Sequence, residues 1–124
     1  SPMANNLYRD LLVWQKSVAL IKEIYALAEK LPKSEEYNLK QQLKRAVVSV
    51  ALNIAEGKNR RTAKDFLNFL NISSGSLAET EAILTICSEL ELLNIPEDIL
   101  THIEELSKML NSLMTSIRSK INNA

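Results

Sequence analysis

The chain has 124 residues, of which 46% are hydrophobic and 5% aromatic, and its 15 Lys and Arg balance its 15 Asp and Glu. This length fits one domain with a hydrophobic core, and few Gly and Pro beside many Lys, Glu, Leu and Ala favour helices over sheets. The single cysteine, Cys87, excludes an intrachain disulfide, and no apolar run is long enough to cross a membrane. We therefore expect a cytoplasmic protein without a membrane segment or a signal peptide.

One domain is expected, over residues 7–122. Ser1-Pro2 ahead of Met3 is typical of a cloning remnant, so residues 1–6 are expected to be disordered and do not enter the fold prediction.

The first helix is predicted over residues 7–31, ahead of Pro32. Its apolar residues recur at alternating spacings of four and three: Leu7, Leu11, Trp14, Val18, Ile21, Tyr25 and Ala28. Val13, Leu20 and Leu27 lie beside this stripe and widen the apolar arc to about 160°. Because a seam with one partner helix does not need so wide an arc, we expect these three residues to contact another subunit.

The second helix is predicted to begin with a capping box, Asn38-Leu39-Lys40-Gln41, or one turn earlier at Ser34, and to end at Gly57. Eight of the ten residues from 46 to 55 are apolar. A helix that is apolar on every side must be buried on every side, so this pattern indicates a central bundle helix that a second subunit also covers. Val48 and Leu52 are the residues expected at that subunit interface.

Two further helices complete the fold prediction. Thr62-Ala63-Lys64-Asp65 is expected to cap the third helix, whose small middle segment, residues 73–76, allows close approach of a neighbouring helix. Asn94-Ile95-Pro96 is the last turn, and the fourth helix follows it. Four helices with short turns predict an all-α, antiparallel, up-down-up-down four-helix bundle, which we expect to assemble as a ring.

Few residues have the chemistry that catalysis needs. His102 falls off the apolar stripe of its helix, and no second His or Cys lies near it in sequence. Cys87 lies between apolar positions, as a core residue does. The carboxylate pairs Glu79/Glu81 and Glu89/Glu91 are two residues apart on a helix and point in different directions. We expect no catalytic residue, no metal and no cofactor.

Charge is spread unevenly along the chain. Residues 1–65 hold 12 Lys and Arg and 7 Asp and Glu, a net of +5, and residues 66–124 hold 3 and 8, a net of −5. Such asymmetry marks either a nucleic-acid face or basic helices that pack beside acidic ones. No aromatic residues interleave the basic turn that follows residue 57, so stacking on bases is not expected.

Two interpretations of this basic turn remain open. In one, Lys58, Arg60, Arg61 and Lys64 surround the free N–H groups at the start of the third helix and form an anion site for RNA or DNA phosphates. In the other, the arginines pair with carboxylates of a structural polar cluster that ties helices or subunits together. The residues of that cluster are Asn53, Glu56 and Glu79.

Several segments follow one another in an order that resembles a known family. They are Asp10-Leu11-Leu12-Val13-Trp14-Gln15-Lys16, Leu31-Pro32, Glu36-Tyr37-Asn38-Leu39, Gln42-Leu43-Lys44-Arg45-Ala46 with Ser49, Asn53-Ile54-Ala55-Glu56-Gly57, and Phe69-Leu70 with Gly75-Ser76-Leu77-Ala78-Glu79. The chain resembles bacterial four-helix-bundle proteins encoded in intervening sequences of 23S ribosomal RNA genes, which are similar to the accessory variability determinants of diversity-generating retroelements.

The resemblance implies a homopentameric barrel of four-helix bundles. It also implies nucleic-acid binding, or binding of a reverse transcriptase for the retroelement relatives, and no catalytic residue. Asn53, Glu56, Arg60 and Glu79 match positions with a structural role. The retroelement relatives are strongly basic, whereas this chain is neutral. Two functions are therefore expected as alternatives: a homo-oligomeric, non-enzymatic accessory protein that binds RNA or DNA phosphates, or an oligomeric scaffold that binds a protein partner.

Overall fold

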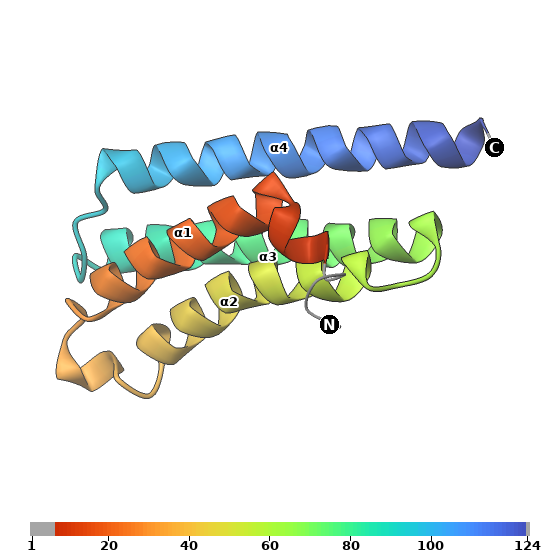
Figure 1. Ribbon diagram of the computed structural model, residues 1–124. Helices are drawn as coiled ribbons and strands as arrows, with labels where there is room; N and C mark the ends of the chain where they lie inside the picture. Colours follow the sequence, from red (N-terminus) through yellow and green to blue (C-terminus); the bar gives the residue numbers. More distant parts are fainter. Residues whose placement is uncertain (1–6, 124) are drawn as a thin grey trace.

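The computed structural model describes residues 7–123, and the prediction for residues 1–6 lies outside this range. Four α-helices follow a short 3-10 helix, η2 (Leu7–Asp10): α1 (Leu12–Ala28), α2 (Leu39–Lys58), α3 (Ala63–Glu89) and α4 (Glu97–Asn122). A second 3-10 turn, η3 (Lys33–Glu35), connects α1 to α2. Residues 7–123 contain no strand, and successive helices run in opposite directions (Figure 1), so the predicted all-α, up-down-up-down arrangement is confirmed.

Each helix packs against the two helices next to it in a closed order, α1 on α2, α2 on α3, α3 on α4 and α4 on α1. The α2–α3 contact is the most extensive and the α1–α4 contact the least. One core runs between the four helices, and its fully buried side chains include Leu20, Ile24, Leu43, Ile54, Leu70, Leu84, Ile103 and Leu110. In the described part of the chain, none of the helices is both long and apolar enough to span a membrane.

The first helix corrects the prediction of a subunit interface on α1. Val13, Leu20 and Leu27 are 5%, 1% and 4% exposed within the single chain, so they cannot contact another subunit. The wide apolar arc of α1 serves three neighbours of the same chain, α2, α4 and η2. The sequence argument assumed one partner helix and assigned the surplus arc to a second subunit.

The second helix leaves part of its apolar surface uncovered. Val50 and Ile54 are buried in the core, Val48 is half-buried, and Leu52 is 63% exposed. Within the single chain, the apolar block is therefore not buried on every side. Val48 and Leu52 remain available for an interface.

Helix ends differ from the sequence prediction at two places. Leu11 has an extended backbone and separates η2 from α1, so the first helix is interrupted and also ends earlier, at Ala28. Asn38 makes no side-chain cap of α2; its Oδ1 accepts from Nε2 of Gln42 at 2.8 Å, and its Nδ2 donates to Glu35. The predicted capping box at residue 38 is wrong because these side-chain partners take the place of the backbone N–H.

Gly57 has a different role from the predicted helix stop. α2 continues through it to Lys58, and no glycine of the described residues has a positive φ. A Cβ on Gly57 would lie 2.7 Å from Cβ of Phe69 and 2.9 Å from Cδ1 of Phe66. Glycine is required here because α3 begins directly against the end of α2.

Candidate nucleic-acid interface

The basic turn (Lys58, Arg60, Arg61 and Lys64) connects the end of α2 to the start of α3. Thr62 caps α3 as predicted: its Oγ1 accepts the backbone N–H of Asp65 at 3.1 Å. The Asp65 side chain lies in the first turn of α3, where a negative charge complements the helix dipole. The cap and Asp65 reduce the anion-binding capacity of the helix N-terminus, so phosphate attraction at this turn depends on the cationic side chains.

Two of these cations are held by their own chain. Nη2 of Arg60 lies 3.7 Å from Oε1 of Glu56, and its guanidinium lies 4.8 Å from the ring centre of Phe69. Nζ of Lys58 lies 5.6 Å from the ring centre of Phe66. The interpretation in which the arginines pair with carboxylates therefore holds for Arg60, because the Glu56 carboxylate neutralises part of the positive charge of the turn.

Arg61 and Lys64 differ from Arg60. Both side chains are exposed, and neither forms an ion pair with any carboxylate between residues 8 and 123. Their charges therefore face solvent and are not held in an ion pair.

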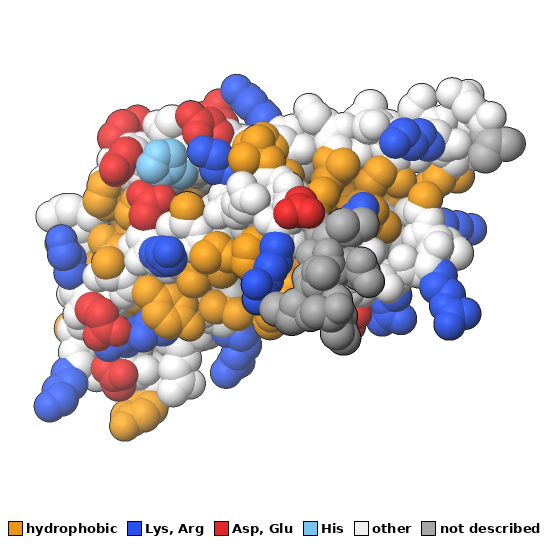
Figure 2. Space-filling view, in the orientation of Figure 1, with side chains coloured by type: hydrophobic (Ala, Val, Ile, Leu, Met, Phe, Trp, Pro, Cys, Tyr) orange, Lys and Arg blue, Asp and Glu red, His pale blue; other side chains and the backbone are white. Residues whose placement is uncertain are grey.

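The fold separates charge along the bundle. One half contains the start of α1, the end of α2, the start of α3 and the end of α4, which correspond to residues 8–20, 49–76 and 110–123. These ranges hold eight Lys and Arg and three Asp and Glu, a net of +5; the remaining described ranges, 21–48 and 77–109, hold seven and twelve, a net of −5. Figure 2 shows Asp and Glu gathered toward the left, whereas the right-hand end carries mainly Lys and Arg.

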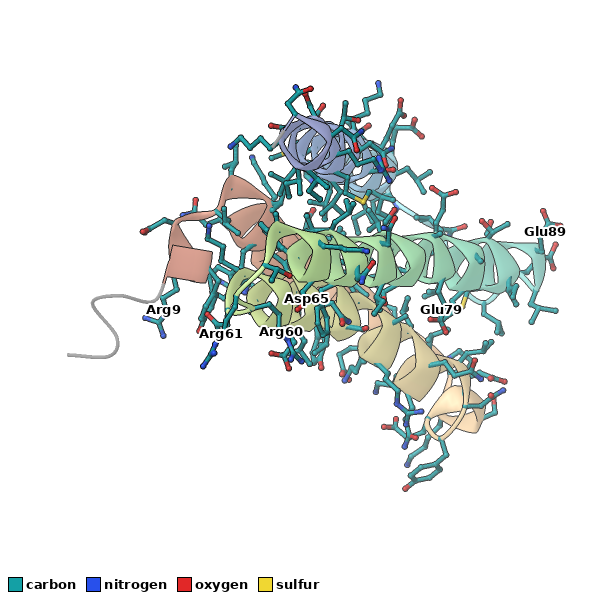
Figure 3. The ribbon with its side chains drawn as sticks, turned by 90° about the vertical axis from the view of Figure 1, so that its right-hand side faces the viewer. Arg9, Arg60, Arg61, Asp65, Glu79 and Glu89 are labelled. Atoms are coloured by element: carbon teal, nitrogen blue, oxygen red, sulfur yellow. The ribbon has the colours of Figure 1, made fainter. Side chains whose placement is uncertain are left out.

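Four more cations share this half of the bundle with the basic turn, and all of them except Lys16 belong to the helices or turns at its end. We call the seven residues the basic end: Arg9, Lys58, Arg60, Arg61, Lys64, Arg118 and Lys120. In Figure 3, Arg9 of η2 lies on the same side of the molecule as Arg60 and Arg61, and Glu79 and Glu89 lie further along α3. Sequence reasoning missed Arg9, Arg118 and Lys120 because they are far from the turn in sequence, and only the chain topology brings them to the same end.

The predicted polar cluster of Asn53, Glu56 and Glu79 is not one unit. Nδ2 of Asn53 donates to the backbone oxygen and to Oγ of Ser49, at 2.8 and 2.9 Å. Oγ of Ser49 lies 2.8 Å from Oγ of Ser76 on α3. Glu79 is exposed and lines a hollow with Arg45 and Ser49.

Serine hydroxyls therefore connect α2 and α3 where a polar cluster of Asn53, Glu56 and Glu79 was expected. In addition to the Ser49–Ser76 pair, the buried Ser73 donates to the carbonyl of Val50 at 2.8 Å. The small side chains of residues 73–76 predicted close contact with a neighbouring helix, but they did not predict which hydroxyl groups form hydrogen bonds across it.

A network of ion pairs stabilises the opposite end of the bundle. Nζ of the buried Lys40 lies 2.9 Å from Glu29 and 3.0 Å from Glu36, and Nζ of Lys44 lies 2.9 Å from Glu29. Hydrogen bonds from Lys44 and Lys40 lower the pKa of Glu29 to about 2. This network links the end of α1 to the start of α2.

The single histidine of the chain forms a hydrogen bond with a carboxylate on the surface, and its single cysteine lies in the core. Nδ1 of His102 lies 2.8 Å from Glu23 Oε1, beside a cavity of about 150 Å³ that Lys16 and Glu105 also line. Because a carboxylate only accepts, Nδ1 of His102 carries the proton. Cys87 is fully buried, and burial raises the pKa of its thiol, with a smaller effect from Glu35.

Comparisons with known proteins place this geometry in context. The family model described as 23S rRNA-intervening sequence protein matches residues 9–112. The chain is similar to a crystal structure of a protein with unknown function from the S23 ribosomal protein family of Bacteroides thetaiotaomicron, with 28% sequence identity and a TM-score of 0.77. That match covers 84% of this chain and 96% of the other. No curated protein matches the sequence.

Proposed function

Because this chain belongs to the 23S rRNA-intervening sequence protein family, we propose that it is a non-enzymatic, homo-oligomeric accessory protein that binds the phosphates of RNA or DNA. The observation that carries this proposal is the pair of exposed cations at the start of α3, Arg61 and Lys64, which form no ion pair with a carboxylate of residues 8–123. They lie in a half of the bundle with a net charge of +5. A zero net charge for the whole chain does not weaken this attraction, because salt screens charges beyond about 10 Å at 0.1 M.

The side chains that catalysis commonly uses support a non-enzymatic role. Cys87 is buried in the core without a base beside it, and the raised pKa of its thiol disfavours the reactive thiolate. His102 pairs with Glu23 on the surface, and no nucleophilic hydroxyl or thiol forms a hydrogen bond with it in residues 8–123.

We propose that oligomerisation uses the uncovered apolar face of α2, centred on Val48 and Leu52. Assembly as a homopentamer is the state that the resemblance implies. Repeating a modest basic surface several times in one particle raises its avidity for a long polyanion without any new contact.

The test is a salt titration of labelled nucleic acid, followed by fluorescence anisotropy. Wild-type affinity is expected to fall linearly in log salt, because binding to phosphates releases counterions. Arg61→Ala combined with Lys64→Ala is expected to weaken binding and to reduce the log–log salt slope by about two, since each phosphate contact contributes about one.

The matched control is Lys30→Ala combined with Lys33→Ala, which removes the same charge from exposed residues at the opposite end. Equal losses in the two double variants would show that binding follows net charge and not the basic turn. An absence of binding at low salt would overturn the nucleic-acid proposal.

The alternative is an oligomeric scaffold for a protein partner. An apolar hollow of about 390 Å³ favours it; Leu11, Leu12 and Val13 line one side, and Met109 and Leu113 of α4 line the other. Leu12 at its rim is 56% exposed. This function predicts that native complexes contain a polypeptide partner and survive nuclease treatment.

A further inference from the structure

We propose that the basic end binds the backbone of double-stranded nucleic acid and does not bind unpaired bases. This inference rests on the proposed phosphate binding and names the class of ligand. It depends on the positions of all six aromatic residues of the chain, because proteins hold single strands by stacking bases on free aromatic faces.

Four of the six aromatic residues lie in the basic half of the bundle, and each ring has a partner from its own chain. The Lys58 ammonium lies over Phe66 and the Arg60 guanidinium over Phe69, at 5.6 and 4.8 Å from the ring centres. Tyr8 and Trp14 pack edge to face, with centroids 5.1 Å apart. All four side chains are half-buried.

The other two aromatic residues lie in the acidic half. The Lys44 ammonium lies 4.7 Å from the ring centre of Tyr25, which is 39% exposed. Tyr37 is 85% exposed, but it follows η3, at the end of the bundle opposite to the basic turn. An open aromatic ring and the phosphate-binding cations are therefore at opposite ends.

The contact with Phe66 leaves the charge of Lys58 available to phosphates, whereas Arg60 shares its charge with Glu56. A Lys or Arg side chain over a ring retains its full charge, while the ring face beneath it is closed to a base. The basic end takes its charges from four places: η2, the end of α2, the start of α3 and the end of α4. Because the aromatic rings are closed to bases, binding depends on phosphates alone. Charges spread over several helix ends can contact both strands of a duplex, which has twice the charge density of a single strand.

The experiment compares four labelled 20-mers by anisotropy at 50 mM salt: an RNA duplex, a DNA duplex, a single strand, and an abasic strand of the same length. We expect at least one duplex to bind ten-fold or more tightly than the single strand. We also expect the single strand and the abasic strand to bind within two-fold of each other, because both offer the same phosphates and bases contribute nothing.

The outcomes separate this inference from the function on which it rests. A single strand that binds ten-fold more tightly than the abasic strand, or as tightly as the duplexes, overturns the inference and leaves phosphate binding standing. No binding to any of the four overturns both. A preference for the RNA or the DNA duplex supports the inference and identifies the duplex that is bound.

Discussion

At the scale of single residues, the two glycines of this chain are both helical but differ in how closely other atoms pack against them. A Cβ on Gly57 would overlap Phe69 and Phe66, whereas a Cβ on Gly75 would meet nothing within 4 Å. The first glycine allows α2 and α3 to meet, and the second only lowers the helix propensity of α3.

Alanine at each glycine gives opposite results. Gly57→Ala is expected to lower the free energy of unfolding by about 1–2 kcal/mol, because overpacking costs about 1–3 kcal/mol and exceeds the gain in helix propensity. Gly75→Ala is expected to raise it by about 0.5–1 kcal/mol. Urea denaturation measures both, and an unchanged stability for Gly57→Ala would mean that the contact with Phe69 relaxes freely.

The Glu29 carboxylate makes stability depend on acid. Its pKa in the folded protein is about 2, below its ordinary value of 4.5, so the stabilisation is present above pH 4.5 and is lost as the pH falls toward 2. Glu29→Gln is expected to be less stable at pH 7 and to lose less stability between pH 4.5 and 2. Thermal unfolding over this range measures the effect, with the exposed Glu81→Gln as the control.

At the scale of elements, the helix ends show which local signals were sufficient. The backbone N–H of Asp65 donates to Thr62, as the sequence predicted, whereas Asn38 bonds to other side chains. α3 ends without a glycine: Glu91 has a φ of 59°, and the N–H of Leu92 donates to the carbonyl of Cys87 at 2.9 Å. That hydrogen bond compensates a backbone conformation that normally favours Gly.

The two capping positions predict different mutational costs. Thr62→Ala is expected to lower the free energy of unfolding by about 1 kcal/mol, because an N–H of α3 loses its acceptor. Asn38→Ala removes only exposed side-chain hydrogen bonds and is expected to cost less than half as much. Equal losses in urea denaturation would show that Asn38 contributes to stability as a true cap does.

At the scale of the whole molecule, the proposed function uses two surfaces. They are the basic end and the apolar face around Val48 and Leu52. Leu52 and Lys58 both belong to α2, so the proposed subunit interface lies close to the basic end.

Assembly is tested most directly at Leu52. Five copies of the 14.0 kDa chain would give about 70 kDa. Leu52→Glu is expected to reduce the mass in light scattering to that of one chain and to leave the helical circular dichroism intact, because this side chain is 63% exposed. Leu20→Glu is the contrast: it places an unpaired charge in the core and is expected to unfold the chain. A wild-type mass of one chain would overturn the oligomer proposal.

The sequence by itself determined the four helices, the Thr62 cap, the core character of Cys87 and the basic turn. These depend on periodicity and on groups a few residues apart, which local sequence specifies. It also pointed to close packing at residues 73–76, where Ser73 and Ser76 bond to α2.

Only the tertiary structure decided which apolar residues are surplus and which charges are free. Val13, Leu20 and Leu27 are buried because α1 packs against three elements of its own chain. The apolar periodicity of a helix does not reveal how many elements pack against it. Arg60 is held by Glu56 and Phe69, whereas Arg61, one residue later, faces solvent. Arg9, Arg118 and Lys120 come to the same end of the bundle as the basic turn because antiparallel helices bring distant parts of the chain together, which spacing along the sequence cannot reveal.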